Sequence, residues 1–158
     1  MLAIGLLFTL RVVAGTLAIA IPLSPWLTSF SLFFFTSLAL AKRNAELRQA
    51  TTRGMDEVKG RGYSRGDWPL TLAFGTGLAV SALVIMLLYV RLEAVQSGLY
   101  SHPLWLLTAP MVVLAWVMRL WMISHRGSLH EDPVIFAMRD RWSWIAALAI
   151  AASLVMAL

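Results

Sequence analysis

Two cations and a carboxylate stand together where an apolar run of the sequence gives way to a polar one. Lys42 and Glu46 are four residues apart, and Arg43 and Glu46 are three apart, so a helix would place all three side chains on one face. Such a face is suited to holding a phosphate group with its metal ion, and also to a plain ion-pair cluster. The residue types assign no catalytic residue, and Glu46 is the candidate metal ligand.

The polar stretch that begins at Lys42 continues to Asp67 and separates two apolar runs. It holds seven of the chain's 13 basic residues. Short loops with an excess of Lys and Arg mark the cytoplasmic face of a membrane protein. The stretch therefore predicts a cytoplasmic loop. Its glycines fit a loop that closes on phosphate groups, or an ordinary connecting loop.

The composition is that of an integral membrane protein. Of the 158 residues, 59% are hydrophobic and 13% are charged, against about 25% charged residues in an average soluble domain. The net charge of +5 belongs to loops between apolar runs, so membrane topology explains it and nucleic acid is not expected as a partner. Because the chain has no cysteine, disulfides and thiolate chemistry are excluded.

The apolar runs predict an all-α protein with five membrane-spanning helices. Two polar segments, at about 44–67 and 124–132, are predicted cytoplasmic loops. The expected spans cover about 1–21, 26–43, 68–90, 103–123 and 133–158. The second span is short, so we expect its helix to continue past Ala41.

The first span contains Arg11 at its centre. A signal peptide would have a basic start and an unbroken apolar middle, so we favour a retained helix. A charged residue at this depth needs a partner or a watery cavity. We therefore expect Arg11 to point into the bundle, either as a site residue or in a structural pairing.

The second polar segment contains Asp132 followed by Pro133. This order is typical of an N-cap followed by proline at the first helical position, so Asp132 is predicted to cap the last helix or to be a ligand. Its segment falls on the same side as the first loop. The chain is thus expected in the inner or plasma membrane, with a cytoplasmic N-terminus and the C-terminus outside.

Several segments resemble the C-terminal half of the UbiA prenyltransferase superfamily, in the branch of decaprenyl-phosphate phosphoribosyltransferase. The match follows the family order through most of the chain. The matching segments are FTLRVVAG (Phe8 to Gly15), Ser24 to Arg48, RGY (Arg61 to Tyr63) and Trp116 to Arg141.

The resemblance implies helices five to nine of a nine-helix bundle whose cytoplasm-facing cavity binds a polyprenyl phosphate or diphosphate. Lys42, Arg43, Glu46 and Leu47 match the Lys-Arg-x-x-Glu-Leu motif of this branch. The implied phosphate-binding residues are Lys42, Arg43, Glu46, Arg11, Tyr63 and Asp132. Mg²⁺ is the implied cofactor, held in the family mainly by an Asn-Asp-x-x-Asp motif that this sequence lacks.

Two functions follow as expectations. The chain is the C-terminal part of a membrane transferase that moves a prenyl or phosphoribosyl group and is inactive without the missing half or a partner chain. Alternatively, it is a non-catalytic membrane subunit or degenerate paralogue, because the first acidic motif is absent. Small-solute transport would need inverted repeats or broken helices, and Pro110 alone does not make that case.

Overall fold

The structure is a computed structural model that describes residues 2–19, 23–52, 65–129 and 131–158. These residues form helices and connections, with no strand among them. The main helices are α1 (Leu2–Ala18), α2 (Pro25–Thr52), α3 (Trp68–Tyr89), α4 (Thr108–His125), α5 (Pro133–Arg139) and α6 (Arg141–Ala157). Short turns η1 (Arg65–Asp67), η2 (Val90–Ala94) and η3 (Pro103–Leu107) precede or follow them, and η2 is a single π-helical turn.

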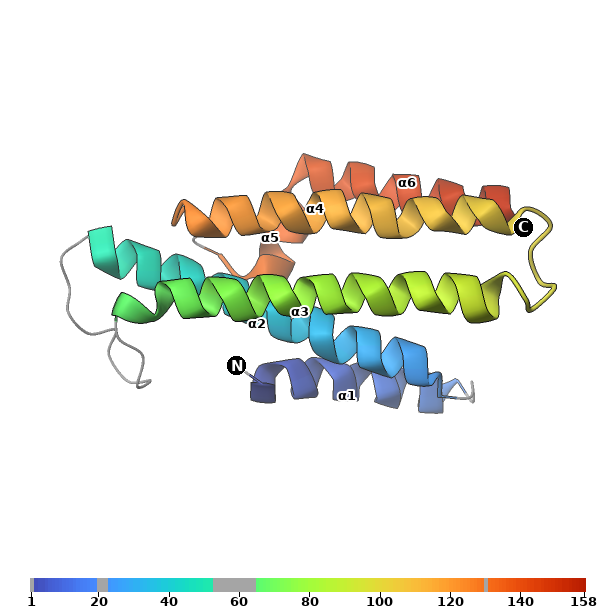
Figure 1. The fold of residues 1–158 in the computed structure, drawn as a ribbon, viewed down its shortest axis with the longest axis horizontal. Helices are drawn as coiled ribbons and strands as arrows, with labels where there is room; N and C mark the ends of the chain where they lie inside the picture. Colours follow the sequence, from blue (N-terminus) through green and yellow to red (C-terminus); the bar gives the residue numbers. More distant parts are fainter. Residues whose placement is uncertain (1, 20–22, 53–64, 130) are drawn as a thin grey trace.

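Except for the short α5, the helices form layers that run roughly along one long axis (Figure 1). α3 and α4 lie side by side in opposite directions, and α6 follows α4 on its far side. α2 crosses α3 and packs closely against it, and α1 packs on α2. At one end, the His102 amide donates a 3.0 Å hydrogen bond to the Ala157 carbonyl and so joins the C-terminus to the α3–α4 connection.

Among the described residues, two helical stretches, Trp68–Ala94 and Pro103–His125, are long and apolar enough to cross a membrane. The bent pair α5–α6 is a third candidate, and α1 is a shorter apolar helix. The predicted helical class is confirmed and its membrane character is supported. Five spans stay a prediction, because α2 carries its charged residues within the helix.

The core lies where α2, α3 and α4 meet. Trp121 from α4 is buried against α3, and a Cβ atom built on Gly75 would overlap its ring. The Ser37 hydroxyl of α2 donates to the Gly75 carbonyl at 2.7 Å and accepts from the Trp121 indole at 3.3 Å. Close helix contact through a small residue, reinforced by interhelical hydrogen bonds, is the usual means of joining membrane helices.

α2 continues past Ala41 as predicted, and it ends only at Thr52. Ala41, Ala45 and Leu47 in this extension are fully buried. The extension is therefore packed inside the bundle. It carries the charged motif of the sequence on a firmly held helix.

The last segment differs from the single helix expected over 133–158. It breaks at Asp140, and the axes of α5 and α6 meet at 81°. Asp140 has extended backbone angles, and its carboxylate accepts hydrogen bonds from the amide and hydroxyl of Ser143, both at 2.9 Å. Arg119 of α4 forms a bidentate pair with the same carboxylate at 2.6 and 2.8 Å. Asp140 thus starts a new helix because two neighbours bind its side chain there.

We expect Gly75→Ala to lower the free energy of unfolding by about 1–3 kcal/mol, since the added methyl group would push Trp121 out of its place. Gly77→Ala is the matched control, because a Cβ atom there meets nothing within 4 Å. Denaturant titration in detergent micelles, followed by circular dichroism, compares the two. Equal midpoints would contradict the close approach of α3 and α4.

We also expect Asp140→Ala to destabilise the chain by about 1.5–3 kcal/mol, as for hydrogen bonds to charged groups. The control is Glu131→Ala, which removes an exposed pair with Arg139 and should cost less than about 1 kcal/mol. The same titration measures both variants. A larger loss for Glu131→Ala would argue against Asp140 as the link between α4 and α6.

Candidate functional site

The charged motif lies in the C-terminal half of α2. Arg43 is buried, with 1% of its side chain exposed, and its Nη1 lies 2.9 Å from Glu46 Oε2. Glu46 and Lys42 are more accessible, at 38% and 42%. The predicted proximity of Arg43 and Glu46 is therefore present, and Lys42 offers the accessible cation of this motif.

Lys42 is directed to the second polar segment. Its Nζ lies 3.5 Å from Oδ2 of Asp132, which is 90 residues away in sequence. The other carboxylate oxygen of Asp132 accepts from the Val134 amide at 3.1 Å and caps α5. The predicted cap is confirmed, and the fold brings Asp132 to the charged motif of α2.

Arg11, another predicted site residue, does not join this group. Arg11 lies on the exposed face of α1, with its guanidinium 5.0 Å from the centre of the Phe8 ring. This corrects the expectation that Arg11 points into the bundle: α1 packs on α2 through the face that carries Gly5 and Thr9. Tyr63 lies outside the described residues, so its predicted role stays a prediction.

Sequence reasoning missed the polar contacts that hold the site in place. Arg48 Nε donates to the His125 carbonyl at 2.9 Å, and Gln49 donates to the Gly127 carbonyl at 2.8 Å. The last carbonyls of a helix lack partners within it, so Arg48 completes the end of α4, and Gln49 holds the residue just beyond its cap. Gly127 leaves α4 at φ +69°, the left-handed conformation that favours glycine at this position.

Asn44 joins α2 to the first turn of α3. It is fully buried, and its amide nitrogen donates to the Trp68 carbonyl at 2.8 Å and to the Thr71 hydroxyl at 3.1 Å. The Arg48 guanidinium lies 4.4 Å from the centre of the Trp68 ring, a cation–π contact. The sequence could have predicted this packing face, because Ser37, Ala41 and Asn44 form a ridge of small and polar residues at helical spacing.

An apolar cavity of about 390 Å³ opens along α4, α5 and α6. Val134 lines it, only two residues after Asp132. Phe34 and Trp116 form an aromatic wall with ring centres 6.1 Å apart, and the Trp116 indole donates to Ser143 at 2.8 Å. The cavity therefore begins near the charged group and continues as hydrocarbon surface, an arrangement suited to a ligand with a polar head and an apolar tail.

The side chains described here do not fit a magnesium site by themselves. In the described ranges, no three His, Asp or Glu side chains gather closely enough to hold a metal ion. The Glu46 carboxylate is bonded to the Arg43 cation, whereas Mg²⁺ is usually held by carboxylates together with phosphate oxygens and waters. The group that could bind a phosphate here is the accessible ammonium of Lys42.

Two curated bacterial proteins are similar to this chain. "Uncharacterized protein y4nM" of Sinorhizobium fredii is 49% identical over 155 residues, covering 98% of this chain and 30% of that protein. "Nodulation protein NoeC" of Azorhizobium caulinodans is 33% identical over 150 residues, covering 94% of this chain and 48% of that protein. The chain thus spans less than half the length of either relative. No protein-family model and no solved structure matches it.

Proposed function

We propose that this chain forms the C-terminal helices of a UbiA-type membrane transferase that acts on a polyprenyl phosphate or diphosphate. The observation that carries the proposal is the Lys42–Asp132 contact. It unites two segments that resemble the family, and it places an accessible cation near an apolar cavity. A polyprenyl phosphate has the same division into an anionic head and a hydrocarbon tail.

In this proposal the lipid phosphate takes the place of Asp132 beside Lys42. A contact of 3.5 Å between side chains that are 42% and 40% exposed is a weak ion pair, worth about 0–1 kcal/mol. A phosphate dianion would form a stronger, charge-assisted contact with the ammonium. Lys42 would then stabilise charge that develops on the phosphate as the bond to the transferred group breaks.

Arg43 and Glu46 have a positioning role in this scheme. Because Arg43 is buried and bonded to Glu46, the pair fixes the turn of α2 that presents Lys42. The hydrogen bonds of Asn44 and Arg48 fix the same turn against α3 and α4. A rigid support of this kind is what a phosphate-binding side chain needs to act without reorganisation.

The lengths of the two relatives are compatible with this proposal, since both carry residues beyond the part that resembles this chain. The family's first acidic motif would lie in such an additional segment or in a partner chain. NoeC is named as a nodulation protein, and we propose that the transferase belongs to the same process.

The alternative is a non-catalytic membrane subunit. It draws on the finding that Lys42, Arg43 and Asp132 each take part in a contact within the chain, as expected for charges that serve assembly. Under this alternative, removal of a charge lowers the amount of folded protein and no pairing with another segment gives turnover.

Substitution of Lys42 separates the two. We expect Lys42→Gln to reduce transfer from a labelled polyprenyl phosphate by about 100-fold or more, the usual loss when one stabilising donor is removed. The amount of protein in the membrane should hardly change, because losing an exposed ion pair costs only about 0–1 kcal/mol. The assay uses membranes in which the chain is coexpressed with a segment carrying the first acidic motif.

Arg139→Gln is the matched control, since Arg139 is a cation of α5, the helix that Asp132 caps, and its side chain is 74% exposed. It should retain full transfer. Glu46→Gln should lower turnover more than abundance. Parallel losses of turnover and abundance in Lys42→Gln and Glu46→Gln would favour the assembly role instead.

The proposed orientation has its own test, because the sequence contains no cysteine. Ser101→Cys, in the exposed α3–α4 connection, should react with a membrane-impermeant maleimide in intact cells. Ser128→Cys, after α4, should react only after the membrane is permeabilised. The reverse pattern would place the Lys42 group on the outer face and remove it from a cytoplasmic substrate.

A further inference from the structure

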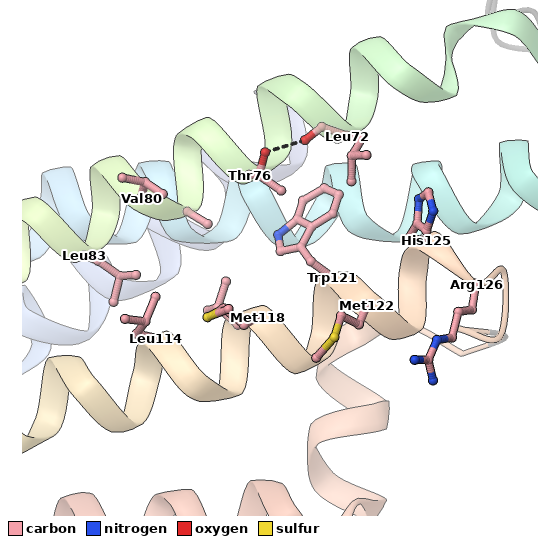
Figure 2. Close-up of a pocket in the computed structure, with 12 residues that line it drawn as sticks. Leu72, Thr76, Val80, Leu83, Leu114, Met118, Trp121, Met122, His125 and Arg126 are labelled. Carbon is pink, nitrogen blue, oxygen red and sulfur yellow. Dashed lines mark hydrogen bonds between the residues drawn. The ribbon is translucent and has the colours of Figure 1, made fainter.

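A second cavity, separate from the one near Asp132, forms a groove of about 420 Å³ between α3 and α4 (Figure 2). Its floor includes the buried side chains of Leu83, Val117 and Trp121. Its edges include Val80 and Met118, which are 56% and 57% exposed. The groove is thus an open apolar channel on the outer surface of the helix pair.

One end of the groove is polar. His125 and Arg126 line it there, in the last turn of α4 and directly after it. Leu114, Met118, Met122 and Arg126 succeed one another at intervals of four residues and so form one ridge along this side of the groove. The ridge carries three apolar side chains and ends in a cation.

Arg126 is exposed and, among the described residues, has no ion pair. Within the part of the chain that the structure describes, the ion pairs involve Lys42, Arg43, Arg119 and Arg139, and Arg126 forms none. An arginine is always charged, so at the end of an apolar groove it can bind an anionic group whose hydrocarbon chain lies in the groove.

The length of the groove points to the kind of lipid. Leu114 and Arg126 are twelve residues apart, roughly 18 Å along a helix at 1.5 Å per residue. Half of a hydrocarbon core of about 30 Å is about 15 Å. With Arg126 at the level of the lipid headgroups, the groove therefore reaches through about one leaflet.

We propose that this groove binds one acyl chain of an anionic phospholipid, whose phosphate lies against Arg126. The methionine side chains along the edge are flexible and polarisable, so they adapt to a mobile hydrocarbon chain. Basic positions between membrane helices are known places for anionic headgroups. The site takes a bilayer lipid and lies apart from the Lys42 group.

A photoactivatable lipid tests the site. The 158-residue chain is reconstituted in phosphatidylcholine nanodiscs with a trace of phosphatidylglycerol that carries a diazirine in its acyl chain. Mass spectrometry then compares labelling of Val80 and Met118 with labelling of Leu148 and Val155, exposed residues of α6. We expect the groove residues to be labelled several-fold more strongly than the α6 residues.

Arg126→Gln should reduce this excess by about fivefold, the loss expected for one attraction between a cation and an anionic headgroup. Arg91→Gln is the matched control, because Arg91 is an exposed arginine in η2, at the far end of α3, and it should leave the excess unchanged. Both replaced side chains are exposed, and circular dichroism checks that the variants remain helical.

The proposal would be overturned by equal labelling from a phosphatidylcholine probe, which would show only bulk lipid contact. It would also fail if Arg126→Gln left the excess unaltered. Dimers whose α3 and α4 residues are protected from the lipid probe would show that a second copy of the chain occupies the groove.

Discussion

The end of α4 is completed by side chains from another helix, and the arrangement of the polar end depends on this contact. The last carbonyls of a helix have no donor within the helix. Arg48 and Gln49 of α2 provide two donors, and Asn44 provides another to α3. These bonds hold α2 at a fixed rotation between its two neighbours. The position of Lys42 follows from that rotation.

The sequence predicted the features that depend on neighbouring residues. The cap at Asp132 and the continuation of α2 past Ala41 follow from local residue order and from helix length, and both are confirmed. The local sequence does not predict the break at Asp140, because an aspartate can also stand inside a helix. Asp140 starts a new helix with the help of Arg119, which lies 21 residues away. No local pattern contains that information.

In the candidate site, too, local spacing predicted some features, and others depend on how distant segments pack. Spacing along α2 predicted that Arg43 and Glu46 meet, whereas burial of Arg43 and accessibility of Lys42 depend on how α2 is turned in the bundle. Arg11 shows that the free-energy cost of a charge in hydrocarbon does not by itself predict where the side chain points. Its depth in an apolar run predicted an inward side chain, but the packing face of α1 is set by Gly5 and Thr9.

The 81° corner between α5 and α6 also affects how the chain would sit in lipid. Because the corner shortens the last helix, α6 has 17 residues, as does α1, and each is roughly 25 Å long. The stretch from Trp68 to Ala94 has 27 residues and reaches roughly 40 Å. A hydrocarbon core of about 30 Å is shorter than the long stretch, which would fit by tilting, and longer than α1 or α6, beside which the bilayer would thin in the proposed five-span arrangement. The bilayer around the chain would thus vary in thickness and would be thinnest where α1 and α6 face the lipid.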